Sequence, residues 1–505
     1  MLSAHLPRRL RGGPAARRGP ARGTPADGAG AAAGPGRGRG GGRRAASLAV
    51  DPGLAVDLLG LTLAEAAARV RRGELSPVDL VEGALLRAES VQPKFNAFLW
   101  LDPDRARAEA RRLAQQRLSG PLWGIPVVLK DLIAEAGAPF TCGSRRRSHV
   151  RAEADAEVTR RLRQAGAVFV GRAHLHEFAY GVSNENPYFG PARNPWDPRR
   201  SPGGSSGGSA VAVATGCVLA SVGTDTGGSV RIPAALCGVV GLKPTYELVP
   251  RDGVFPLAPS LDHVGPLART VEDVALVLEV LVGAPGRYTA DLGSRVRGLR
   301  IGVPGGAFWE LAADGVLERF DEAVRLLERE GARRVPVEFP WEAASAAATA
   351  VLMVEASWVH LRGLREDLEG FGSDVRERLL VGLALPGERY VRALSVRRVL
   401  ARRAWQLLKD EVDVLATPTT PIPAPHLGEG TTPLGGREHD TRALLTRFTN
   451  PLNALGLPAL SVPCGIVDGL PVGLQLVGRP GDEATVLATG RALERARGPF
   501  PRPPV

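Results

Sequence analysis

Apolar residues recur at two spacings along the chain, and the two alternate from about residue 62 onward. A spacing of three or four residues indicates a helix, whereas a short continuous apolar run indicates a buried strand. Ser76-Pro77-Val78-Asp79 marks a helix start, because it combines a capping serine, a proline in the first turn and an acid near the positive helix end. We predict helices at Thr62–Gly73, Ser76–Ser90, 103–117, Ala156–Gln164, Gly208–Thr215, 314–331, 343–366, 387–410, 441–454 and 482–497.

Strands are predicted between these helices. They fall at Asn96–Trp100, Ile125–Leu129, Ala167–Gly171, Val218–Gly223, Leu299–Val303, Val412–Ala416, Leu460–Val462 and Val472–Val477. Alternation of strands and helices is typical of a sheet that helices cover on both faces. The sequence therefore predicts an α/β fold, and it shows no internal repeat at the periods of solenoids or propellers.

The chain has a formal net charge of +11, which raises the question of a nucleic-acid or membrane partner. Residues 1–50 contain ten arginines and a single acid, Asp27, so most of the excess lies in this segment. Its Gly, Ala, Pro and Arg composition cannot bury enough surface to offset the entropy of ordering. We predict a disordered basic tail at 1–50 and a folded body at 51–505. A transit peptide, a nucleic-acid-binding arm and an upstream start codon all remain open for the tail.

The four cysteines show no CxxC spacing, and the start of the chain lacks a long apolar signal region. We therefore expect reduced, packing cysteines and a cytoplasmic protein. No uninterrupted run of 18 apolar residues occurs, so no transmembrane helix and no membrane partner are predicted.

Two Gly-rich segments, 201–210 and 223–231, stand out for their composition. A phosphate cradle is one interpretation, but neither segment has the Lys-Ser/Thr ending of a P-loop or a GxGxxG run after a strand. A flexible linker is another, although a predicted helix and strand follow the first segment at once. An oxyanion hole beside a nucleophilic serine is the third, and Gly227-Gly228-Ser229 suits it because small residues expose the hydroxyl and its neighbouring amides.

A serine nucleophile needs a base. Among the eight histidines, His174 and His176 lie in an HLHE run, but no HExxH metal motif is present. A buried lysine can serve instead, because burial disfavours its charged form. Lys130 ends the apolar run Gly124–Leu129, which places it at the carboxyl edge of a predicted buried strand, where sites form in α/β sheets. A surface lysine at a strand end is the competing interpretation.

These segments resemble the amidase signature family. The resemblance rests on the two Gly-rich segments and on the runs at 124–131, 194–197, 237–245 and 469–475, and it covers about residues 54–498. It implies a single α/β/α domain around a large mixed sheet, and hydrolysis of an amide without a metal or organic cofactor.

Matched position by position, the resemblance implies that Lys130 is the catalytic base. It also implies that Ser205 is the serine that follows a cis peptide bond, and that Ser229 is the nucleophile. In that family the two serines are 24 residues apart, and this spacing to Ser229 selects Ser205 over Ser206. The backbone amides implied to form the oxyanion hole are those of Thr226, Gly227, Gly228 and Ser229.

Asp225 and Arg231, which flank the second Gly-rich segment, are expected to support this loop through hydrogen bonds. The family contains stand-alone amidases and also the glutaminase-type subunit of the tRNA-dependent amidotransferase, which releases ammonia from glutamine. Ile232 and the run Glu247-Leu248-Val249-Pro250 depart from the pattern of that subunit, so we expect a stand-alone amidase. The glutaminase-type subunit is the alternative, and a non-catalytic binding module is a further one. The expected partner is a small-molecule amide rather than nucleic acid, and a homodimer is left open.

Overall fold

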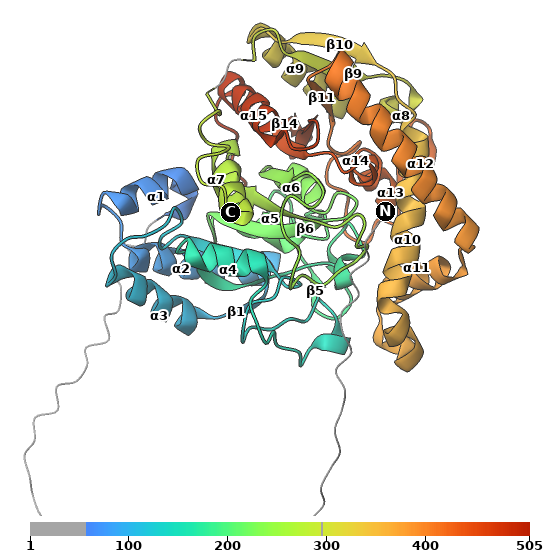
Figure 1. The fold of residues 1–505 in the computed structure, drawn as a ribbon. Helices are drawn as coiled ribbons and strands as arrows, with labels where there is room; N and C mark the ends of the chain where they lie inside the picture. Colours follow the sequence, from blue (N-terminus) through green and yellow to red (C-terminus); the bar gives the residue numbers. More distant parts are fainter. Residues whose placement is uncertain (1–56, 294–295) are drawn as a thin grey trace, which may run out of the picture. The chain divides into compact units, whose positions relative to one another are not determined.

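A mixed eleven-stranded β-sheet is the centre of this computed structural model, which describes residues 57–293 and 296–505 (Figure 1). The predicted tail at 1–50 lies outside the described residues. In spatial order the strands are β1 (Phe98–Leu101), β3 (Val168–Ala173), β2 (Pro126–Lys130), β6 (Ala220–Asp225), β8 (His263–Ala268), β7 (Val240–Lys243), β14 (Ala459–Val467), β15 (Leu470–Val477), β11 (Val414–Pro418), β9 (Arg300–Pro304) and β10 (Arg333–Val337).

Two groups of strands in the sheet are parallel. The first is β3, β2 and β6, and the second is β10, β9 and β11. The remaining neighbours pair antiparallel, as β6 does with β8 and β14 with β15. The mixed sheet confirms the predicted α/β fold class.

Helices cover both faces of this sheet. On β14, a Cβ added to Gly490 of α15 would lie 2.6 Å from Leu460 Cδ2, so Leu460 points toward α15 (Glu483–Arg497). The next residue, Ser461, lies beside Gly473 of β15, whose other neighbour is Ala235 of α6 (Arg231–Cys237). Adjacent strand residues point to opposite faces, so α15 and α6 lie on opposite sides of the sheet.

The remaining helices follow the predicted pattern in most places. Ser76 accepts from Asp79 N–H at 3.1 Å and caps a helix with Pro77 in its first turn, although this helix ends at Phe95 rather than Ser90. The other helices of at least six residues are α1 (Leu63–Arg71), α3 (Pro103–Ala114), α4 (Glu157–Gln164), α5 (Gly207–Ala214), α7 (Val271–Val282), α9 (Asp314–Arg329), α10 (Trp341–Glu366), α11 (Ser373–Ala384), α12 (Gly387–Gln406), α13 (Thr441–Thr446) and α14 (Asn450–Leu455).

Several elements differ from the prediction. The strands β7, β8 and β10 and the helices α7 and α11 were not predicted, and the helix predicted at 441–454 is two helices. The break falls at Arg447–Thr449, where Thr449 Oγ1 donates to Gly227 O at 2.6 Å and Pro451 starts the next turn. A tertiary contact to the Gly-rich loop thus interrupts a segment that looks helical throughout.

The long helix α10 contains an 18-residue window of mean hydropathy 1.3, which is enough by length and composition for a membrane span. The sequence prediction included no such helix, because it rested on uninterrupted apolar runs. In the structure α10 packs against α11, α12 and α14 (Figure 1). Its polar residues include buried Glu355, which accepts from Ser260 Oγ at 2.6 Å. These contacts are those of a helix within a packed globular layer.

Candidate active site

Lys130 is the last residue of β2, at the carboxyl end of the parallel group β3, β2 and β6. The side chain is fully buried, and Nζ donates to Ser205 Oγ at 2.7 Å and to Thr224 Oγ1 at 2.9 Å. Burial lowers the pKa of Lys130 to about 7, although the nearby carboxylates of Asp225 and Asp262 favour the charged form. A large fraction of Lys130 is therefore neutral near pH 7, the state in which an amine accepts a proton.

Ser205 lies just before α5, and the peptide bond that joins it to Gly204 is cis. Its side chain is fully buried beside the lysine. The next residue connects the two serine-bearing loops, because Ser206 N–H donates to Ser229 O at 3.2 Å and Ser206 Oγ donates to Thr224 O at 3.2 Å. These contacts gather the lysine and both serine loops into one cluster.

Ser229 lies in the short loop between β6 and α6. Only 5% of the residue is exposed, and it lines a cavity of about 390 Å³, a volume that suits a small-molecule ligand. Thr226 and Gly227 line the same cavity. Ser229 and part of its loop therefore line a single cavity.

The Gly228 amide differs from the expectation for an oxyanion donor. Its N–H donates to Asp225 Oδ1 at 2.9 Å, so it is engaged within the loop. Gly228 has a φ of 131°, and a Cβ there would lie 2.6 Å from Ile232 Cδ1, so the position requires glycine. For the amides of Thr226, Gly227 and Ser229, the assignment to an oxyanion hole stays a prediction.

Asp225 and Arg231 form a buried ion pair at the base of this loop. Arg231 Nη2 lies 2.8 Å from Asp225 Oδ1, and Arg231 Nε lies 3.0 Å from Oδ2. Burial alone would raise the pKa of Asp225, but Arg231 outweighs it and holds the pKa below the usual range of a carboxyl group. Arg231 also donates to Gln475 Oε1 at 2.7 Å and to Asn453 Oδ1 at 2.6 Å, which anchors the loop to β15 and to α14.

The cavity beside Ser229 is lined by both apolar and polar side chains. The apolar ones include Leu352 and Met353 of α10 and Val381 of α11. The polar ones include Tyr180, Arg378, Arg442 and Asn450. An opening of this composition can hold a small amide with an aliphatic part and at least one further polar group.

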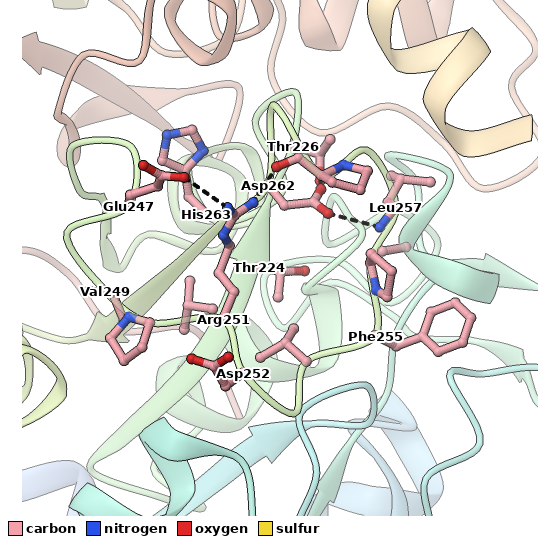
Figure 2. Close-up of a pocket in the computed structure, with 16 residues that line it drawn as sticks. Thr224, Thr226, Glu247, Val249, Arg251, Asp252, Phe255, Leu257, Asp262 and His263 are labelled. Carbon is pink, nitrogen blue, oxygen red and sulfur yellow. Dashed lines mark hydrogen bonds and ion pairs between the residues drawn. The ribbon is translucent and has the colours of Figure 1, made fainter. Parts of the chain in front are cut away.

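A second cavity, of about 350 Å³, shares Ala179, Thr226 and Leu257 with the first (Figure 2). Figure 2 shows Asp262 between two of these residues, accepting from Thr226 Oγ1 at 2.6 Å and from Leu257 N–H at 2.9 Å. Burial raises the pKa of Asp262 to about 6. Asp262 thus holds Thr226, the residue that follows β6, through its side chain.

Sequence reasoning missed Thr224, Tyr180 and Asn450 at this site. Thr224 carried a weak signal, because it is the last-but-one residue of a strand that leads into the Gly-rich loop. Asn450 comes from a helix more than 200 residues away, and only the fold brings it to the cavity.

Neither His174 nor His176 lies in a metal-binding cluster, and no group of three potential ligands is found within 57–293 and 296–505. His174 Nε2 lies 2.9 Å from Gly190 O, and His176 Nε2 lies 2.9 Å from Asp374 Oδ2. The four cysteines are buried free thiols.

Comparison with known proteins gives consistent matches over most of the chain. The family model described as Amidase matches residues 79–487. One subunit of the glutamyl-tRNA(Gln) amidotransferase of Chloroflexus aggregans is 42% identical, over 86% of this chain and 96% of that protein. The same subunit from Halorhodospira halophila is 43% identical, with the same coverage.

Solved structures agree with this assignment. One described as a crystal structure of amidase has a TM-score of 0.82 and 40% identity, covering 86% of this chain and 99% of the other. The native peptide amidase from Stenotrophomonas maltophilia has a TM-score of 0.74 and 34% identity, covering 87% and 98%. The chain is therefore a member of the amidase family, whose enzymes hydrolyse amide C–N bonds.

Proposed function

We propose that this enzyme hydrolyses a carboxamide through an acyl-enzyme on Ser229, with Ser205 and Lys130 relaying the proton. The observation that supports this most strongly is the buried contact of 2.7 Å between Lys130 Nζ and Ser205 Oγ, made by a lysine whose pKa is lowered to about 7. A structural lysine in the same place would need no such shift, whereas a general base requires a pKa near the working pH.

The reaction starts when Ser229 Oγ attacks the amide carbonyl carbon. Its proton passes to Ser205 Oγ as the Ser205 proton passes to neutral Lys130. The resulting tetrahedral oxyanion is held by the backbone amides of Thr226, Gly227 and Ser229. Each such donor typically contributes roughly 2.7–4 kcal/mol to the transition state.

Collapse of this intermediate breaks the C–N bond. The proton on Lys130 returns through Ser205 to the leaving nitrogen, which departs as ammonia or an amine, and Ser229 remains acylated. Water then attacks the acyl carbon, with the same relay taking its proton and returning it to Ser229 Oγ. Carboxylate is released and no net proton stays on the enzyme groups.

Ammonia release from a panel of simple amides, including glutamine, tests this proposal. Wild type should hydrolyse at least one amide, and Ser229→Ala should lose that activity while its circular dichroism spectrum is unchanged. If neither form released ammonia and Ser229→Ala kept the full biological function of the protein, the chain would instead be a binding module with an unused triad.

The second candidate is the glutaminase-type subunit of a tRNA-dependent amidotransferase, with glutamine as the ammonia source. Relatives described as subunits of the glutamyl-tRNA(Gln) amidotransferase support it, at 42–43% identity over 96% of their length. Ile232 and the run at 247–250 depart from the pattern of the glutaminase-type subunit, which supports the stand-alone interpretation. Glutamine turnover that appears only when amidotransferase partner proteins and tRNA are added would establish this second candidate. We expect a cytoplasmic location for the protein under either candidate function.

A further inference from the structure

Building on the proposed function, we propose that the substrate is an amide that also carries a carboxylate. In this assignment Tyr180, Arg378 and Arg442 bind the carboxylate in the cavity beside Ser229. The three residues line that cavity, and they come from three separate parts of the fold.

Arg442 supplies a half-exposed cation whose ion pair is long. Its side chain is 47% exposed and its Nε lies 4.0 Å from Asp440 Oδ1, an oxygen that already accepts from Ala443 N–H at 2.7 Å as the cap of α13. Burial and the neighbouring charge of Arg378 both lower the pKa of Arg442. Two neighbouring guanidinium groups that repel each other are stabilised by an anion that contacts both.

Tyr180 supplies a hydroxyl that lacks a partner. The residue is 4% exposed, it lines the cavity, and its Oη makes no hydrogen bond within the described part of the chain. The Arg378 guanidinium lies 4.9 Å from the centre of the Tyr180 ring, and Arg378 Nη2 donates to Asp374 Oδ2 at 2.8 Å. Arg378 Nε is also buried without a partner among residues 57–293 and 296–505. Buried donors in this state are costly unless a ligand accepts from them.

Asn450 is assigned to the amide end of the substrate. Its Nδ2 donates to Thr349 Oγ1 at 3.1 Å, while its Oδ1 is buried without a partner among the described residues. A Cβ on Gly227 would lie 3.6 Å from this oxygen, so this acceptor is next to the loop at 226–229. It can accept from the amide N–H of a substrate whose carbonyl faces Ser229.

The distribution of charge also argues against an amino acid zwitterion. Glu377 is the one acid among the described residues that line the cavity, against the two arginines Arg378 and Arg442. An α-ammonium group beside the carboxylate would meet Arg378 and Arg442 without a buried carboxylate to pair with it. We therefore expect a monoanionic amide to be preferred over glutamine.

Matched substrates separate these features. Glutamine without its amino group is 4-carbamoylbutanoate, and pentanamide is the same chain with a methyl group in place of the carboxylate. The pair 3-carbamoylpropanoate and butanamide repeats the comparison at a shorter length. In each pair, we expect kcat/KM to be higher for the anion by roughly tenfold or more, mainly through KM, and 4-carbamoylbutanoate to exceed glutamine.

Arg442→Gln and Tyr180→Phe should each lower the ratio of kcat/KM between 4-carbamoylbutanoate and pentanamide by roughly tenfold. Arg437→Gln is the matched control, because Arg437 is exposed on β13 (Arg437–Asp440) and does not line the cavity. That variant also loses one positive charge, and it should leave the ratio unchanged.

Calorimetric binding of the same compounds to Ser229→Ala keeps the test independent of turnover. Tighter binding of the anions, lost in a protein that also carries Arg442→Gln, supports the inference even where the proposed chemistry fails. Equal binding and equal turnover of each anion and its uncharged counterpart would overturn the inference and leave the proposed function standing. A preference for glutamine over 4-carbamoylbutanoate would also overturn it, and would favour the amidotransferase role.

Discussion

Lys130 Nζ lies 2.7 Å from Ser205 Oγ, and both residues are fully buried. The contact joins the end of a central strand to the residue just before α5. It brings a lysine with a pKa lowered to about 7 into contact with the Ser205 hydroxyl, while the next residue, Ser206, donates its N–H to Ser229 O. The rate should therefore report the protonation state of this lysine.

Activity on a neutral amide should rise with pH through about 7 and level off above it. Below that pH Lys130 is protonated and cannot accept the serine proton, so kcat/KM should fall about tenfold per pH unit well below the midpoint. The measurement is a pH profile of kcat/KM for pentanamide, or for another neutral amide if that one is not hydrolysed.

Glu177→Gln is the control for this profile. Burial raises the pKa of Glu177 to about 7 as well, but its carboxylate accepts from Ser144 and Gly372 and does not contact Lys130. The midpoint should stay in place in this variant. A wild-type profile that is flat from pH 5.5 to 9 would contradict the assignment of Lys130 as base.

Removing the two serines should give strongly non-additive losses. Ser205→Ala and Ser229→Ala interrupt the same proton relay. We therefore expect each to lower kcat/KM by about 10³-fold or more, and the double variant to lose little beyond either single variant. Steady-state kinetics of the three variants measure this. Losses that multiply would show that the serines act in separate steps.

Asp225→Asn should destabilise the fold. The change leaves the Arg231 guanidinium buried without its carboxylate, which typically costs about 3–5 kcal/mol. The carboxylate contribution is present above the unfolded carboxyl pKa and is lost only as pH falls through the lower folded value, so the cost should persist from pH 5 to 8.

Urea unfolding measures this cost, and Arg199→Gln provides the comparison. Arg199 pairs with Asp197 at 2.9 Å, but 80% of its side chain is exposed. That variant should unfold at the same urea concentration as wild type. Equal midpoints for Asp225→Asn and wild type would refute a structural role for the buried pair.

Gly228→Ala should disable the enzyme, since a Cβ has no space beside Ile232 and the φ of 131° is strained for alanine. A displacement of the loop by about 1 Å can cost about 10²-fold in rate. Gly387→Ala is the matched control, because a Cβ at Gly387 meets nothing within 4 Å. Ammonia release by the two variants compares them, and similar activities would remove the steric argument.

Much of the fold could be predicted from local pattern. The capped helix at Ser76 and the buried run before Lys130 both carry their signal within a few residues. The strand β8 does not, because His263, Gly265 and Pro266 interrupt its apolar pattern. Its pairing with β6 and β7 is what makes it a strand.

The candidate site divides in the same way. Lys130, Ser205 and Ser229 lie in motifs that are visible in the sequence. Arg442 and Asn450 reach the cavity from α13 and α14, whose separation depends on a tertiary contact of Thr449. Residues that determine what binds are thus placed by long-range packing, which a single sequence does not display.

The anchoring of Arg231 to Asn453 and Gln475 has a consequence for synthesis on the ribosome. All three proposed catalytic residues are translated by position 229, yet the acceptors that hold their loop emerge more than 200 residues later. A nascent chain that ends before Gln475 has the chemical groups but lacks this support for the loop. Activity should therefore appear only when translation of the chain is almost finished.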